Sequence, residues 1–82
     1  MRIEHVGSGC RVHVSAQDIA YFCRRWPASG LHGLRGVEFE FAKNGDLVDI
    51  EYRNGSSEDW DGPALVALSQ DAQQHARRRG AL

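Results

Sequence analysis

The chain has 82 residues, 41% of them hydrophobic, and eleven acidic side chains nearly balance ten basic ones to give a net charge of −1. This length is enough for one small globular domain over residues 1–82 and excludes two, and the composition is not that of a disordered chain. No apolar run could span a bilayer and no secretory pattern follows Met1, so we expect a cytoplasmic protein.

The first fifteen residues are predicted to form β structure. Residues 1–6 and 11–14 alternate apolar and polar side chains on either side of the turn-forming sequence Gly7-Ser8-Gly9. The two segments form either a first hairpin or a single strand with an irregular lead-in.

A helix is predicted next, over about residues 16–25. Ser15 is a suitable N-cap, and Asp18 three residues later completes a variant of the capping box. Apolar side chains follow at helical spacing, and Cys23 falls among them, so we expect its thiol to be buried. Pro27 ends the helix, and a glycine-punctuated loop follows.

Residues 36–52 carry the clearest signal, which is two alternating runs joined by Asn44-Gly45. An Asn-Gly pair between such runs is typical of a two-residue hairpin turn, and the turn fixes which residues lie opposite each other. With that turn, Lys43 lies opposite Asp46. The predicted apolar pairs are Phe41 with Val48, Phe39 with Ile50, and Val37 with Tyr52.

The opposite face of this hairpin is predicted to be acidic. Residues 36–63 hold eight acids against two basic side chains, while the segments before and after them are net basic. Four of these acids should lie side by side on one face: Glu38, Glu40, Asp49 and Glu51. Because opposed like charges destabilise a sheet, a counter-charge is expected, and Arg11 and His13 would supply it from a neighbouring strand. The face is then either a mutually screened, solvated surface or a docking surface for a basic partner.

A second helix is predicted after a polar connection at residues 54–59. Asp61 is its expected N-cap, Pro63 lies in its first turn, and it should end near Gly80, with residues 78–82 frayed. Its apolar side is predicted to hold Leu65, Leu68, Ala72 and either His75 or Ala76. The order of elements predicts an α+β fold, in which two helices cover one face of a small antiparallel sheet of three to four strands.

Arginines and tryptophans form a second set of candidates. The arginines gather near the predicted ends of both helices, where the helix dipole favours cations whatever the function: Arg24, Arg25, Arg77, Arg78 and Arg79. They would serve a nucleic-acid-binding protein if they shared one surface. Trp26 is expected to be largely buried, whereas Trp60, flanked by acids, is the better candidate for exposed recognition.

Catalysis and metal binding are not predicted. The serines lack a nucleophile-elbow context, and an open strand face offers no pocket that would separate the pKa values of paired carboxylates. Two cysteines and four histidines show no paired ligand spacing, so neither a disulfide framework, a metal site nor a cofactor is expected.

Three segments together resemble short uncharacterised proteins encoded by bacteriophages and prophages of proteobacteria. They are residues 24–31 (RRWPASGL), 44–49 (NGDLVD) and 61–65 (DGPAL), and the likeness spans about residues 15–76. The resemblance implies a bacterial cytoplasmic setting and an accessory phage role, and it carries no assigned activity or functional residue.

Taken together, these patterns predict a small non-enzymatic interaction module. The expected docking surface for a protein partner consists of Glu38, Glu40, Asp49, Glu51 and Trp60. In the phage setting this partner would be a host protein. The alternative is a nucleic-acid-binding accessory protein that uses the arginines named above. We expect a monomer, or a homodimer that pairs through the second hairpin strand if that strand is a free edge, and no membrane association.

Overall fold

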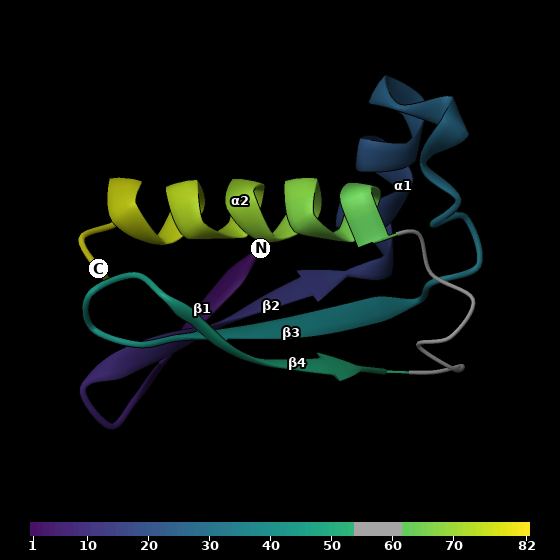
Figure 1. Ribbon diagram of the computed structural model, residues 1–82. Helices are drawn as coiled ribbons and strands as arrows, with labels where there is room; N and C mark the ends of the chain where they lie inside the picture. Colours follow the sequence, from purple (N-terminus) through teal and green to yellow (C-terminus); the bar gives the residue numbers. More distant parts are fainter. Residues whose placement is uncertain (54–61) are drawn as a thin grey trace.

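The computed structural model describes residues 1–53 and 62–82. Its elements are β1 (Arg2–Val6), β2 (Gly9–Ser15), α1 (Ala16–Arg25), the short 3₁₀ helix η1 (Pro27–Ser29), β3 (Gly36–Phe41), β4 (Leu47–Tyr52) and α2 (Gly62–Arg78). The strands form one antiparallel sheet in the order β1-β2-β3-β4, and both helices lie on the same side of it (Figure 1). The predicted α+β class is confirmed, and the N-terminal segment is a hairpin.

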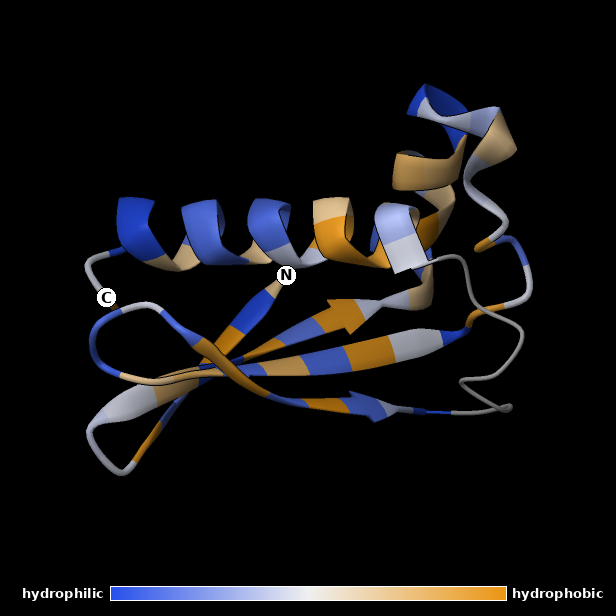
Figure 2. Cartoon of the chain, in the orientation of Figure 1, coloured by the Kyte–Doolittle hydropathy of each residue, from blue (hydrophilic) through white to orange (hydrophobic). Residues whose placement is uncertain are grey.

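Apolar and polar residues alternate along the strands (Figure 2), so the sheet has one apolar and one polar face. On the two central strands this apolar face is almost fully buried, and it holds Cys10, Val12, Val14, Val37, Phe39 and Phe41. Side chains of α1 and α2 complete the same core, so the polar face is left on the side away from the helices. Among the described residues, no helix is long and apolar enough to cross a membrane.

Helix α1 begins and ends where its sequence signals place it. Ser15 Oγ accepts a hydrogen bond from the Asp18 N–H at 3.1 Å, and the Ser15 N–H donates to Asp18 Oδ2 at 3.0 Å, so the capping box is complete. The helix buries Cys23 as predicted. Trp26, which we expected to be largely buried, is only partly so, with its ring centroid 5.9 Å from that of Phe22.

The segment after α1 contributes to the core, which its glycine-rich sequence did not indicate. Ser29, Leu31 and Leu34 are all buried. The Ser29 hydroxyl accepts a hydrogen bond from the Leu31 N–H at 3.3 Å and donates to the Cys23 sulfur at 3.5 Å. These contacts tie the segment back onto α1.

The predicted two-residue turn at Asn44-Gly45 is wrong. The Gly45 N–H donates to the Ala42 carbonyl at 2.8 Å, and the Ala42 N–H donates to the Asp46 carbonyl at 2.8 Å, so the loop consists of Lys43, Asn44 and Gly45. Gly45 has a φ of 96°, a left-handed conformation that suits glycine in the last position of a three-residue loop.

A bulge at Val48 restores the predicted register farther along the hairpin. Phe41 lies opposite Leu47 and Glu40 lies opposite Asp49, so Val48 has no partner and the predicted Phe41–Val48 pair is wrong. The longer loop shifts the pairing by one residue and the bulge shifts it back, so the acids stay on the polar face. The remaining predicted pairs are confirmed: Glu40–Asp49, Phe39–Ile50, Glu38–Glu51 and Val37–Tyr52.

Helix α2 closes the core and ends in a capping motif. It buries Ala64, Leu65, Leu68, Ser69, Ala72 and Ala76, so Ala76 rather than His75 continues the apolar side. Gly80 has a φ of 73°, its N–H donates to the Arg77 carbonyl at 3.1 Å, and the Ala81 N–H donates to the Ala76 carbonyl at 2.8 Å. This is a Schellman motif, and it brings Ala81 and Leu82 against the core. The predicted N-cap, Asp61, lies outside the described residues.

Candidate functional site

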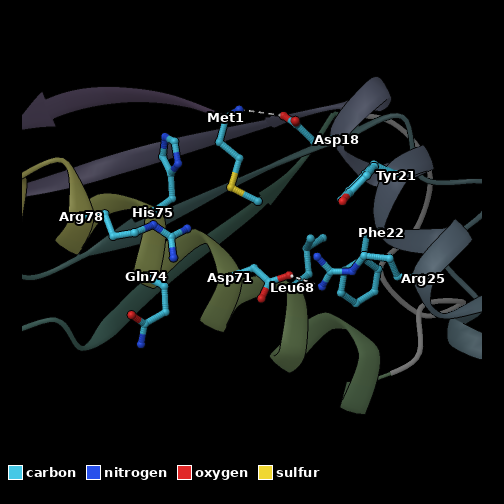
Figure 3. A pocket seen from close by; sticks show the side chains of 10 residues that line it. All are labelled: Met1, Asp18, Tyr21, Phe22, Arg25, Leu68, Asp71, Gln74, His75 and Arg78. Atoms are coloured by element: carbon cyan, nitrogen blue, oxygen red, sulfur yellow. Dashed lines mark hydrogen bonds and ion pairs between the residues drawn. The ribbon is translucent and has the colours of Figure 1, made fainter.

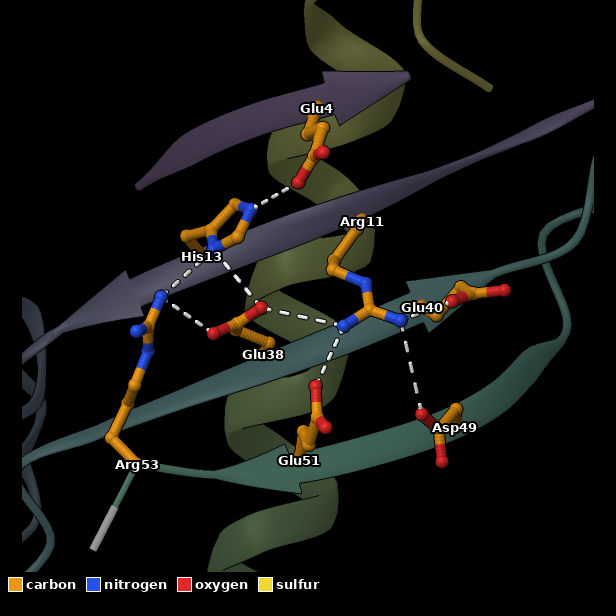
Figure 4. Close-up of polar contacts among 8 residues, drawn as sticks. All are labelled: Glu4, Arg11, His13, Glu38, Glu40, Asp49, Glu51 and Arg53. Carbon is orange, nitrogen blue, oxygen red and sulfur yellow. Dashed lines mark hydrogen bonds and ion pairs between the residues drawn. The ribbon is translucent and has the colours of Figure 1, made fainter. Parts of the chain in front are cut away.

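The polar face of the sheet is organised around Arg11 (Figure 4). The β2–β3 register places Arg11 opposite Glu40 and His13 opposite Glu38, so the predicted counter-charge lies beside the acidic hairpin. The Arg11 guanidinium approaches four carboxylates, at 2.6 Å for Glu40, 2.7 Å for Glu51, 3.4 Å for Glu38 and 4.0 Å for Asp49. These carboxylates, Glu40 foremost, raise the pKa of Arg11 above its ordinary value.

Further polar contacts gather on Glu38. The Arg53 guanidinium lies 2.6 Å from Glu38 Oε2, and His13 Nδ1 lies 3.2 Å from Glu38 Oε1. On its other side, His13 Nε2 lies 2.8 Å from Glu4 Oε1, and the hydrogen bond to His13 lowers the pKa of Glu4. Glu38 therefore has three cationic or imidazole neighbours, counting Arg11.

Sequence reasoning missed Arg53 and Glu4, although the sequence contains a signal for each. The alternation of β4 continues past Tyr52, which places Arg53 on the polar face with Glu51. Glu4 pairs with Arg11 once the two N-terminal segments are joined as a hairpin. The missing step was the extent of β4 for Arg53 and the pairing of the two N-terminal segments for Glu4.

Exposure divides the four predicted acids into two groups. The side chains of Glu38 and Glu40 are 12% and 32% exposed, whereas those of Asp49 and Glu51 are 57% and 61% exposed. The difference follows from position, since among the described strands β3 lies inside the sheet and β4 lies at its edge. The acids that remain available to a partner are therefore those of β4.

Exposed apolar side chains lie near the start of β4. Leu47 and Val48, at the bulge, are both exposed, and so is Val66 on α2. Leu47 and Val66 line a shallow hollow of about 300 Å³ where the start of β4 meets α2. Trp60, the remaining predicted member of this surface, lies outside the described residues.

Two of the predicted nucleic-acid-binding arginines share a cleft of about 390 Å³ between α1 and α2 (Figure 3). Arg25 and Arg78 line it from the two helices, above a floor that includes Phe22 and Leu68. Arg25 is paired with Asp71 at 3.3 Å. The cleft therefore carries acidic groups as well as basic ones.

The other three arginines do not line this cleft. Arg24 lines a separate hollow on α1, and Arg79 lies beside His5 and His75 near β1. Arg77 packs on the hairpin turn, where a Cβ placed on Gly45 would be 2.6 Å from its Nη2 atom. The structure thus does not gather the five arginines on one surface, because successive residues of a helix point in different directions.

Comparison with known proteins adds no candidate function. No protein-family model, curated protein or solved structure matches the chain. A function is therefore to be inferred from the geometry of the chain's own residues.

Proposed function

We propose that the protein is a non-enzymatic interaction module that docks on a basic partner protein through the acidic β4 edge of its sheet. The observation that carries the proposal is that the side chains of Asp49 and Glu51 are more than half exposed, whereas those of Glu38 and Glu40 are 12% and 32% exposed. The phage setting implied by the sequence segments would make this partner a cytoplasmic host protein.

The edge combines the features that a specific docking surface requires. Arg11 holds Glu51 at 2.7 Å, so this carboxylate is oriented on a rigid strand before any partner arrives. Exposed charges of one sign attract and orient an oppositely charged partner. Leu47 and Val48 add exposed apolar area that association would remove from water. Charge would then select the partner, and apolar contact would hold it.

Charge reversal at the two edges of the sheet tests the proposal. We would measure by fluorescence anisotropy the affinity of a short labelled peptide of alternating Lys and Ser for the wild type, Glu51→Lys and Glu4→Lys. Both glutamates lie on the polar face and are well exposed, at 61% and 50%, but Glu4 is on β1. We expect Glu51→Lys to weaken binding about tenfold at low salt and Glu4→Lys to have a much smaller effect. Equal losses in the two variants would contradict docking at β4.

A second candidate function is supported by one observation on the helical side. Tyr21 is exposed, and the guanidinium carbons of Arg24 and Arg25 lie 5.7 Å and 5.5 Å from the centre of its ring. An exposed aromatic ring beside cations is a typical platform for a base of single-stranded nucleic acid. Arg78, across the cleft, would add a phosphate contact.

Amide-resolved NMR titration with single-stranded and duplex DNA tests this second candidate. If the candidate is right, DNA should cause chemical-shift changes around Tyr21 that decrease between low and physiological salt. These changes should be lost when Arg25 and Arg78 are both changed to Gln. The matched control changes Arg77 and Arg79 to Gln, which removes the same charge from two side chains that do not line the cleft. Absence of shifts at either salt concentration would eliminate the nucleic-acid candidate.

A further inference from the structure

We infer that the partner binds by adding an extended segment to β4 as a fifth strand of the sheet, with basic and apolar side chains alternating along that segment. The inference rests on the proposed docking function and specifies how the partner engages the acidic edge. It draws on three features: the backbone groups that β4 turns outward, the side chains on each side of them, and the charges that act against a second copy.

The hydrogen-bond pattern of β4 shows which backbone groups face outward. The Arg53 N–H donates to the Gly36 carbonyl at 2.9 Å, so these two residues form a hydrogen-bonded pair. Such pairs alternate along an antiparallel ladder, which directs the backbone groups of Asp49 and Glu51 toward β3 as well. The N–H and C=O groups of Ile50 and Tyr52 therefore point away from the sheet.

These outward groups lie at the free edge of the sheet as far as the structure describes the chain. The described residues form four strands with β4 at one end of their order. The bulge at Val48 interrupts the regular edge on one side, so the edge available for pairing begins at Asp49. A short segment of a few residues is enough to cover it.

The side chains of β4 specify what such a segment must carry. Asp49 and Glu51 project to the polar face, so residues beside them on an added strand are favourable when basic. Ile50 and Tyr52 project to the helix side, where they are only partly buried against the core. An added strand would extend this apolar face, so its residues opposite Ile50 and Tyr52 should be apolar.

A second copy of the chain fits this edge less well than a basic partner. Antiparallel self-pairing centred on Ile50 would place Asp49 of each copy opposite Glu51 of the other. Arg53, which could relieve the repulsion, is held by Glu38 at 2.6 Å. Charged edge strands are a common way in which proteins prevent self-association. The same acids that oppose a second copy favour a basic segment.

Backbone methylation of a peptide distinguishes strand addition from docking by charge alone. The probe is a short peptide of alternating Lys and Val, made in three forms: unmodified, N-methylated on its valines, and N-methylated on its lysines. In an antiparallel addition the valines lie opposite Ile50 and Tyr52 and exchange hydrogen bonds with them. We expect methylation of the valine nitrogens to weaken binding about tenfold or more and methylation of the lysine nitrogens to be tolerated.

The protein's own amides provide the second readout. On binding the unmodified peptide, the Ile50 and Tyr52 N–H groups should shift and become protected from hydrogen exchange, whereas the already bonded N–H groups of Asp49 and Glu51 should change much less. Equal binding of the two methylated peptides would overturn strand addition and leave docking by charge intact. Failure of every lysine-containing peptide to bind would overturn the proposed function itself. If sedimentation shows a dimer without peptide, and the Ile50 and Tyr52 amides of that dimer are protected from hydrogen exchange, the occupant of the edge is a second copy. The proposal of a basic partner would then be overturned.

Discussion

Neutralising Glu38 should destabilise the fold far more than neutralising Glu51, although the two residues face each other across β3 and β4. Glu38 lies 2.6 Å from an Arg53 nitrogen, 3.2 Å from a His13 nitrogen and 3.4 Å from an Arg11 nitrogen. Its side chain is 12% exposed, so water could replace few of these contacts. Among the described residues, Glu51 has one close polar contact, to Arg11, and its side chain is 61% exposed.

The magnitudes follow from these contacts. A hydrogen bond to a charged group contributes roughly 1.5–3 kcal/mol, and the amide of a Glu38→Gln variant retains part of this set, which predicts a loss of about 2 kcal/mol in the free energy of unfolding. An exposed ion pair contributes about 0.5 kcal/mol, which is the loss expected for Glu51→Gln. With an unfolding entropy of about 2.1 cal/mol/K per residue, these losses lower Tm by about 12 °C and about 3 °C.

Urea unfolding followed by circular dichroism at neutral pH would measure both variants against the wild type. A repeat at high salt should reduce the effect of Glu51→Gln more than that of Glu38→Gln, because screening acts mainly on exposed charges. Equal losses for the two variants, or a Glu38→Gln protein as stable as the wild type, would refute the view that Glu38 stabilises the fold more than the exposed Glu51 does.

Three further predictions concern the fold that presents the edge. Ser15→Ala removes the oxygen that caps the Asp18 N–H and should cost about 1 kcal/mol in urea unfolding, and an unchanged midpoint would argue against the capping box. Leu68→Ala, at a fully buried position, should cost about 3 kcal/mol, while Val66→Ala on the exposed side of α2 should cost much less, so similar losses would contradict the assigned orientation of the helix. Burial, together with nearby positive charges, lowers the pKa of His75, so its imidazole binds a proton more tightly in the unfolded chain than in the folded one. The free energy of unfolding should therefore fall as pH drops from about 7 toward about 5. His75→Gln should flatten that dependence, and identical pH profiles of the variant and the wild type would exclude His75 as its source.

The parts of the fold that the sequence predicts are those determined by near neighbours. Ser15 and Pro27 bracket α1 because a cap and a proline act on the adjacent backbone. The choice between two turns at Asn44-Gly45 was not local, since Gly45 suits either one. In the structure, the Gln73 side chain of α2 donates to the Gly45 carbonyl at 2.6 Å, a contact between residues far apart in the chain.

In the candidate site, too, the sequence predicts what depends on near neighbours and not what depends on distant parts of the chain. Period-two alternation predicted that Arg11 would share a face with the hairpin acids, because side-chain direction along a strand is a local property. The exposure of Glu51 and the occupation of Glu38 depend on which strand lies at the edge of the sheet, and alternation carries no information on strand order. Likewise, the helical repeat separates Arg77 from Arg78, but which of the two faces the cleft depends on how α2 is rotated against the core.

The paired irregularities of the β3–β4 hairpin have a consequence for how the chain can vary in length. Loss of Val48 would leave Phe41 opposite Leu47 and bring Asp49 next to it opposite Glu40, which is a regular ladder with the same later pairs. Loss of a residue beyond the bulge, such as Ile50, would instead send Asp49 to the core side of the sheet. A one-residue deletion at the tip of this hairpin therefore leaves the later register unchanged, whereas one a few residues farther along disrupts it. The tip is thus where homologous chains can differ in length without disturbing the acidic edge.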